Sequence, residues 1–126
     1  MNEEKKIILV VDDSGASLRM IKAWFEEKHQ AILANSGSMA LKYLKSNIPD
    51  IILLDYEMPV MNGYEVLKKI KEENSYAKEV PVLFLTGMDE IEHMLENMEL
   101  KPDGYIKKNM DPKKIVQVVE EILYRE

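Results

Sequence analysis

A chain of 126 residues with a net charge of −6 is of the right size for one domain, here residues 1–126, that folds around its own core. Because it has no cysteine, a disulfide framework, a zinc–thiolate site and a cysteine nucleophile are excluded. Lys and Arg are interleaved with acids, and no apolar run approaches the length of a signal sequence or membrane span, so we expect a cytoplasmic protein that binds neither nucleic acid nor membrane.

Five apolar segments predict the strands of a parallel sheet. Residues 7–11, 51–54 and 82–85 are continuously apolar and rich in branched side chains, which is typical of strands buried on both faces. Residues 31–34 and 104–106 carry a weaker pattern, so we expect them at the edges of the sheet.

Helical patterns alternate with these strands. Apolar residues recur at helical spacing within residues 18–25, 40–44, 66–70, 91–98 and 115–123. Asp111 followed by Pro112 predicts the start of the last helix, and Asn62 with Glu65 predicts a capping box at the start of the third.

Strict alternation of strand and helix predicts a doubly wound α/β fold, a five-stranded parallel sheet with helices on both faces. We expect the flavodoxin-like strand order 2-1-3-4-5, in which strands 1 and 3 are neighbours. Ligands of such folds bind beyond the carboxyl ends of the strands, at the switch point of the sheet.

Polar residues follow four of the predicted strands at that edge. Asp12 and Asp13 come after the first strand, Asp55 after the third, Thr86 after the fourth and Lys107 after the fifth. Taken singly, each has a structural explanation, since Asp and Thr cap helices and a Lys at a strand end is usually solvated. Their occurrence together favours a functional site.

The acidic residues of this set predict a metal site. Carboxylates about 4 Å apart repel by roughly 4 kcal/mol per pair at an effective dielectric constant near 20, so a cluster of three calls for a cation. Oxygen ligands select a hard ion, and Mg²⁺ is expected, with Mn²⁺ as a substitute. His29 and His93 lie on helix patterns and are expected at the surface.

The same residues predict phosphoryl transfer. A carboxylate can act as a nucleophile toward a phosphoryl group, and Asp55 is the candidate because it stands alone on its strand. Lys107 would place a positive charge on a phosphoryl oxygen, and the Thr86 hydroxyl would donate a hydrogen bond to another.

The chain resembles the response-regulator receiver domain of two-component signalling, of the chemotaxis-type single-domain kind. The resemblance extends over nearly the whole chain and depends on Val10-Val11-Asp12-Asp13, Leu54-Asp55-Tyr56-Glu57-Met58-Pro59-Val60-Met61-Asn62-Gly63, Leu85-Thr86-Gly87 and Gly104-Tyr105-Ile106-Lys107. It implies that Asp12, Asp13 and Asp55 bind Mg²⁺ together with the backbone carbonyl of Glu57, and that Asp55 is the phosphoacceptor.

The resemblance also implies a switch and a set of partners. Thr86 and Lys107 would contact the phosphoryl group, and the ring of Tyr105 would turn inward on activation. A histidine kinase or a phosphotransfer protein would be the phosphoryl donor, and residues 88–124 would bind a downstream protein or a fused effector domain, with a phosphorylation-dependent homodimer left open. Such a domain is not an enzyme beyond its self-catalysed phosphorylation and dephosphorylation.

One departure and two alternatives accompany this interpretation. The family usually has Pro directly after the switch Lys, whereas Lys108 follows Lys107 here. A receiver-like interaction module that is never phosphorylated is therefore one alternative. The other is an aspartyl-nucleophile phosphatase or phosphotransferase of the dehalogenase type, which would have a second Asp where Glu57 stands.

Overall fold

The computed structural model describes residues 5–73 and 76–125, which form one parallel sheet of order β2-β1-β3-β4-β5 flanked by helices. The strands are β1 (Ile7–Val11), β2 (Gln30–Ala34), β3 (Ile51–Asp55), β4 (Val82–Thr86) and β5 (Gly104–Lys107). The helices are α1 (Gly15–Phe25), α2 (Gly37–Leu44), α3 (Gly63–Glu73), the short 3₁₀ helix η1 (Ala77–Glu79), α4 (Ile91–Glu96) and α5 (Pro112–Leu123). The predicted fold class, strand order and edge strands are confirmed; η1 was not predicted.

Within the described residues, no helix has the length and apolar character needed to cross a membrane.

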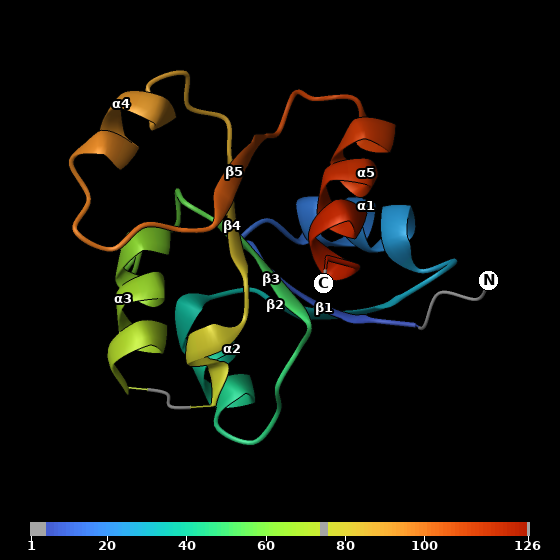
Figure 1. Ribbon diagram of the computed structural model, residues 1–126, viewed down its shortest axis with the longest axis horizontal. Coiled ribbons are helices and arrows are strands. Elements are labelled where there is room, and N and C mark those ends of the chain that lie inside the picture. The colour runs from blue at the N-terminus through green and yellow to red at the C-terminus, as the bar shows by residue number, and fades with distance from the viewer. Residues whose placement is uncertain (1–4, 74–75, 126) are drawn as a thin grey trace.

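Helices cover both faces of the sheet, as Figure 1 shows, with α1 and α5 on one side and α2, α3 and α4 on the other. Successive strand residues point to opposite faces. In β1, Ile8 and Val10 join the buried cluster under α1 and α5, whereas Leu9 and Val11 join the cluster under α2, α3 and α4. The interior strands are apolar throughout because both of their faces are covered.

The predicted helix starts are confirmed by their hydrogen bonds. The Asp111 side chain accepts the N–H of Lys113, and Pro112 is the first residue of α5. At α3 the N–H of Glu65 donates to Asn62 Oδ1 at 2.9 Å, and the N–H of Asn62 donates back to Glu65 Oε1 at 3.0 Å. This reciprocal pair satisfies two backbone donors and orients the loop that enters α3.

Gly63 lets α3 begin directly against the end of β3. A Cβ atom at this position would lie 2.8 Å from Tyr56 Cα and 2.9 Å from the carbonyl oxygen of Asp55, both of which are backbone atoms. The N–H of Gly63 also donates to the Tyr56 carbonyl at 2.8 Å. The loop between β3 and α3 is therefore held against Asp55 by a contact that only glycine permits.

Val60 stands at the tip of that loop in a strained conformation. Its φ is 67°, and the side chain is fully exposed. The N–H of Met61 donates to the Pro59 carbonyl at 2.7 Å, which closes a γ-turn around Val60. A branched residue at positive φ costs of order 1–3 kcal/mol, and the surrounding loop must maintain this geometry.

His29 is buried, with 2% of its surface exposed, so its expected surface position is wrong. Its Nδ1 accepts the backbone N–H of Lys6 at 3.2 Å, and its Nε2 lies 2.9 Å from Glu120 Oε2 on α5. The ring of Tyr124 lies 6.1 Å away. The imidazole thus connects three segments, which are the start of β1, the turn that follows α1, and the helix α5. His93 is exposed, as predicted.

Candidate functional site

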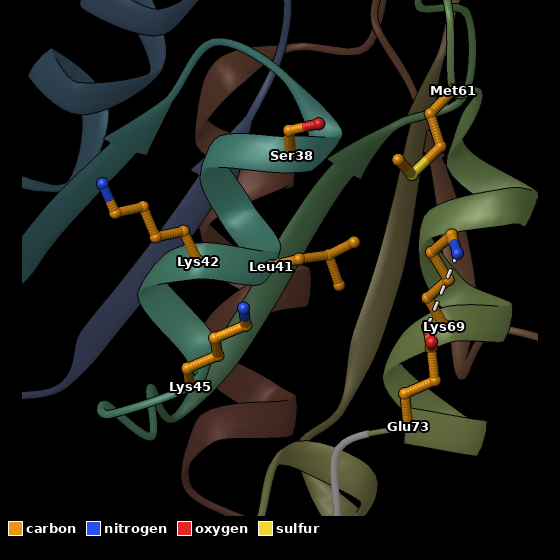
Figure 2. Close-up of a pocket in the computed structure, with 7 residues that line it drawn as sticks. All are labelled: Ser38, Leu41, Lys42, Lys45, Met61, Lys69 and Glu73. Atoms are coloured by element: carbon orange, nitrogen blue, oxygen red, sulfur yellow. Dashed lines mark ion pairs between the residues drawn. The ribbon is translucent and has the colours of Figure 1, made fainter.

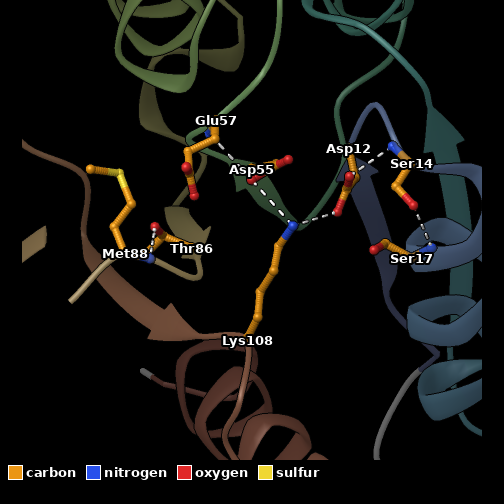
Figure 3. A network of polar contacts seen from close by, with 8 residues as sticks. All are labelled: Asp12, Ser14, Ser17, Asp55, Glu57, Thr86, Met88 and Lys108. Atoms are coloured by element: carbon orange, nitrogen blue, oxygen red, sulfur yellow. Dashed lines mark hydrogen bonds and ion pairs between the residues drawn. The ribbon is translucent and has the colours of Figure 1, made fainter.

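Three carboxylates meet at the carboxyl ends of β1 and β3. Asp12 and Asp55 are 0% and 2% exposed, Asp13 is exposed, and one ligand oxygen from each lies within 4.8 Å of the others. The N–H of Ser14 donates to Asp12 Oδ1 at 2.9 Å, and the N–H of Glu57 donates to Asp55 Oδ1 at 3.3 Å (Figure 3). The structure therefore brings together the three acidic residues singled out in the sequence.

The amine that enters the pocket belongs to Lys108, and not to Lys107 as the sequence interpretation had it. Lys108 Nζ lies 3.1 Å from Asp12 Oδ2 and 3.4 Å from Asp55 Oδ1, between the two carboxylates (Figure 3). No ion pair joins Lys107 to the described residues. The strand β5 runs through Lys107, one residue further than predicted, and the N–H of Lys108 donates to the Thr86 carbonyl at 2.8 Å.

Strand alternation explains the choice between the two lysines and could have revealed it. The pocket residues Asp12, Asp55 and Lys108 each stand two positions after a strand residue buried under α1 and α5, namely Val10, Leu53 and Ile106. Lys107 lies only one position after Ile106, so it belongs to the opposite face of the sheet. With Lys108 in the pocket, the residue after the pocket lysine is Asn109, and the described residues contain no cis peptide bond.

Burial and like charge raise the pKa of Asp55 to about 7. Removal from water is the largest cause and the neighbouring Asp12 carboxylate the second, whereas Lys108 and the Glu57 N–H act in the opposite direction. Burial lowers the pKa of Lys108, but Asp55 and Asp12 outweigh it, and the net pKa is raised. The ammonium of Lys108 is therefore charged, and the Asp55 carboxyl is easily protonated near neutrality.

One oxygen of Asp55 remains available for chemistry. The Glu57 N–H and Lys108 Nζ both contact Oδ1. In the described part of the chain, no hydrogen bond reaches Oδ2. A carboxylate held through one oxygen presents the other in a defined direction, which suits nucleophilic attack.

Thr86 and Tyr105 lie on the other side of β4 and β5 from Lys108. Thr86 is 0% exposed, and its Oγ1 accepts the N–H of Met88 at 3.0 Å. The hydroxyl of Tyr105 donates to the Glu92 carboxylate of α4, and its ring packs against the buried cluster under α2, α3 and α4. The hydrogen bond to Glu92 is also the largest cause of a raised pKa at the Tyr105 hydroxyl.

The donor set fits a hard divalent cation. When all three carboxylates are ionised, the one ammonium of Lys108 leaves a local charge of −2. Two carboxylates whose oxygens lie within 4.8 Å of each other repel by about 3.5 kcal/mol or more at an effective dielectric constant near 20. The available ligand atoms are all oxygens, and they lie beside the open oxygen of Asp55. Mg²⁺ sites that also bind phosphate share these two features.

Comparison with known proteins identifies the family. A family model for the response regulator receiver domain matches residues 8–120. The chain belongs to this family. Receiver domains bind Mg²⁺ in an acidic pocket and exchange signals with histidine kinases and effector domains, and they are signalling domains rather than enzymes of metabolism.

Individual relatives agree with this family. Response regulator SaeR of Staphylococcus epidermidis is 33% identical over 119 residues, which are 94% of this chain and 50% of that protein. Histidine kinase P4 of Formosa agariphila is 32% identical over 121 residues, which are 96% of this chain and 9% of that protein. The solved structure of chemotaxis response regulator CheY4 of Vibrio cholerae has a TM-score of 0.84 at 26% identity, covering 94% of this chain and 98% of that one. The chain spans about half the length of the curated regulators it matches first.

Proposed function

We propose that this receiver domain accepts one phosphoryl group on Asp55 in a Mg²⁺-dependent reaction and thereby changes which partner it binds. The observation that carries the proposal is the placement of the Lys108 amine between the buried Asp12 and Asp55 carboxylates, with one oxygen of Asp55 left without a hydrogen bond from the described residues. A buried acid with a pKa near 7 is costly to keep for stability alone, which favours a functional role.

The reaction transfers the phosphoryl group from the donor atom to the Asp55 carboxylate. The free Oδ2 of Asp55 forms a bond to phosphorus while the bond from phosphorus to the donor breaks, and the donor nitrogen or oxygen leaves with the bonding electrons and takes up a proton. Mg²⁺, when bound, supplies positive charge to the phosphoryl oxygens. Lys108 supplies a second positive charge from the α5 side, and its contact with Asp55 Oδ1 lowers the pKa of that carboxyl, which favours the ionised form.

Asp12, Asp13 and Asp55 are the residues that would hold the cation, with the backbone carbonyl of Glu57 as a further ligand. The Glu57 N–H donates to Asp55, so its backbone lies beside the pocket. Asp13 is exposed while Asp12 is buried, which suits one ligand that fixes the ion and one that remains in contact with water. Mn²⁺ has the same ligand preference and would substitute.

The switch would begin at Thr86 and reach the surface through Tyr105. The Thr86 hydroxyl now accepts the Met88 N–H, and it can donate its own hydrogen to a phosphoryl oxygen. In the strand register Phe84 pairs with Tyr105 and Thr86 with Lys107, so Thr86 and Tyr105 lie on the same face of the sheet. A shift of Thr86 would therefore open space on that face. Two or three charge-assisted hydrogen bonds of about 1.5–3 kcal/mol each can supply the roughly 5.5 kcal/mol that a full switch requires.

The partners follow from this switch. A histidine kinase or a phosphotransfer protein would donate the phosphoryl group in the cytoplasm. The surface formed by residues 88–124 would bind a downstream protein or a fused effector domain, with a phosphorylation-dependent homodimer as a further outcome. Residues 1–126 would act as one receiver domain, and catalysis would be limited to self-phosphorylation and self-dephosphorylation.

Two adjacent lysines provide a matched test of the proposal. We would incubate the protein with Mg²⁺ and acetyl phosphate and record the intact mass of the wild type and of Asp55→Asn, Lys108→Ala and Lys107→Ala. The wild type and Lys107→Ala should gain one phosphoryl group, and Asp55→Asn or omission of Mg²⁺ should prevent it. Lys108→Ala should react about 10- to 100-fold more slowly, the equivalent of one charge-assisted hydrogen bond.

Three results would contradict the proposal. Equal loss of labelling in Lys107→Ala and Lys108→Ala would show that the pocket amine has no special role. Multiple turnovers of the phosphodonor would instead indicate a phosphatase. No adduct on a folded, Mg²⁺-bound protein would favour an interaction module that is never phosphorylated.

A further inference from the structure

A groove of about 620 Å³ lies between α2 and α3, on the face of the sheet away from α1 and α5 (Figure 2). Residues from both helices and from the loop before α3 line it: Ser38, Leu41, Lys42, Lys45, Met61, Lys69 and Glu73. Ser38, Leu41 and Lys42 of α2 and its C-cap residue Lys45 follow one another at spacings of three, one and three, so they form one face of that helix. This face of α2 is therefore not covered by α3.

The two helices meet at the start of α2 and leave the groove beyond it. Gly37 is buried, and a Cβ atom there would lie 2.6 Å from Val66 Cγ2 and 3.1 Å from Met61 Sδ. Met61, beside this contact, and Leu41, one turn further along α2, form an apolar floor, since both are partly buried against the core cluster under α2 and α3. The close contact at Gly37 bounds one end of the groove.

The rim of the groove is basic, although the chain has a net charge of −6. Lys42, Lys45 and Lys69 are exposed, and the single lining acid, Glu73, pairs with Lys69 at 3.6 Å. The lining residues thus carry three positive charges and one negative. Figure 2 shows the three amines apart from one another rather than gathered around one point. Such a rim fits an extended anionic ligand better than a single small anion.

Apolar surface continues beyond Lys45. A second hollow shares Lys45 with the groove and is lined by Ile48 and Tyr76, which are 56% and 70% exposed. Large exposed apolar side chains beside a recessed apolar floor are typical of protein docking sites. A flat lipid surface could not reach Leu41 and Met61 between two helices, whereas a narrow helix edge could.

We propose that the α2–α3 groove binds an acidic amphipathic helix of a partner protein. Apolar residues of that helix pack on Leu41 and Met61, and its acidic residues pair with Lys42, Lys45 and Lys69. The groove shares no lining residue with the carboxylate pocket of Asp12, Asp55 and Lys108, so this interaction is separate from phosphoryl transfer.

The test uses a synthetic peptide of about 15 residues, the length at which isolated helices become stable, with Leu on one face and Glu on the rest. Its control has Lys in place of every Glu. Binding to the full chain is followed by nuclear magnetic resonance, with expected shift changes at Ser38, Leu41 and Met61. Anionic vesicles are tested in parallel.

Two protein variants of equal net charge control for long-range attraction. One carries Lys42→Gln, Lys45→Gln and Lys69→Gln, and the other carries Lys5→Gln, Lys22→Gln and Lys28→Gln at exposed positions outside the groove. The first should bind the acidic peptide about tenfold more weakly, equivalent to 1.4 kcal/mol, and the second should change by less than about twofold. Both should still be phosphorylated by acetyl phosphate at the wild-type rate, which keeps this result independent of the pocket chemistry.

The following outcomes would overturn the proposal. No binding of the acidic peptide, equal binding of the Lys peptide, or equal weakening in the two triple variants would each show that the groove does not select acidic helices. Vesicle binding without peptide binding would assign the basic rim to membranes. Self-association that only the groove variant loses would assign it to a second copy of this chain.

Discussion

The raised pKa of Asp55 predicts that Mg²⁺ affinity depends steeply on pH. The cation needs the ionised carboxylate, so protons compete with Mg²⁺ wherever Asp55 is protonated in the metal-free protein. Because the pKa is about 7, the apparent dissociation constant should be close to its limiting value at about pH 8 and about tenfold weaker at about pH 6. An ordinary surface carboxylate would show almost no change over this range.

The same pKa fixes the number of protons released. At about pH 6 roughly 0.9 of the Asp55 sites are protonated, and at about pH 8 roughly 0.1, so each bound Mg²⁺ should displace about one proton at the lower pH and almost none at the higher. Isothermal titration calorimetry in two buffers with different ionisation enthalpies measures this number directly.

Two variants sharpen the measurement. Asp55→Asn should bind Mg²⁺ more weakly and with no pH step in this range. Lys108→Gln removes a positive charge that lowers the Asp55 pKa, so its pH step should move upward. An affinity that is flat between about pH 6 and about pH 8, or proton release that persists in Asp55→Asn, would refute the assignment of the step to Asp55.

Three further predictions concern stability. Without Mg²⁺, Asp55→Asn should raise the free energy of unfolding measured in urea. The difference from the wild type should grow by about 1 kcal/mol from about pH 6 to about pH 8, because the raised pKa of the Asp55 carboxyl gives the wild type stability that is lost as pH rises through about 7. A difference that does not change with pH would contradict this. Val60→Gly should stabilise the domain by about 1 kcal/mol in the same assay by relieving the positive φ, whereas Val60→Ala, which keeps a Cβ, should gain less. Gly63→Ala should lower the melting temperature at a cost of roughly 1–3 kcal/mol, because its Cβ would meet backbone atoms of Asp55 and Tyr56; an unchanged melting temperature would show that the loop yields easily.

The alternation of side chains between the two faces of each strand predicts more of the site than the residue types alone do. The interior strands and the acidic residues after them could be found because burial on both faces requires apolar runs, and parallel strands end at a common edge. The choice between Lys107 and Lys108 needs the face of each residue, and counting by twos from Ile106 resolves it. Residue type alone could not separate two neighbouring lysines.

Other features depend on contacts that no local pattern records. His29 was expected at the surface because it lies on a helix pattern in the sequence, but it is buried where the turn after α1 meets α5, and its partner Glu120 is 91 positions away in the chain. The strain at Val60 arises from the short turn that joins Pro59 to Met61. The groove between α2 and α3 depends on how closely two helices approach, which the helix patterns do not determine.

The hydrogen bonds of His29 select one tautomer of its ring. A backbone N–H can only donate, so the bond from Lys6 requires an unprotonated Nδ1, and Nε2 must then carry the hydrogen that points to Glu120. The imidazole nitrogen signals in a magnetic resonance spectrum therefore report whether α5 remains seated against the start of β1. Since α5 belongs to the surface expected to bind output partners, this single ring provides a native spectroscopic probe of that helix, with no foreign reporter group attached to it.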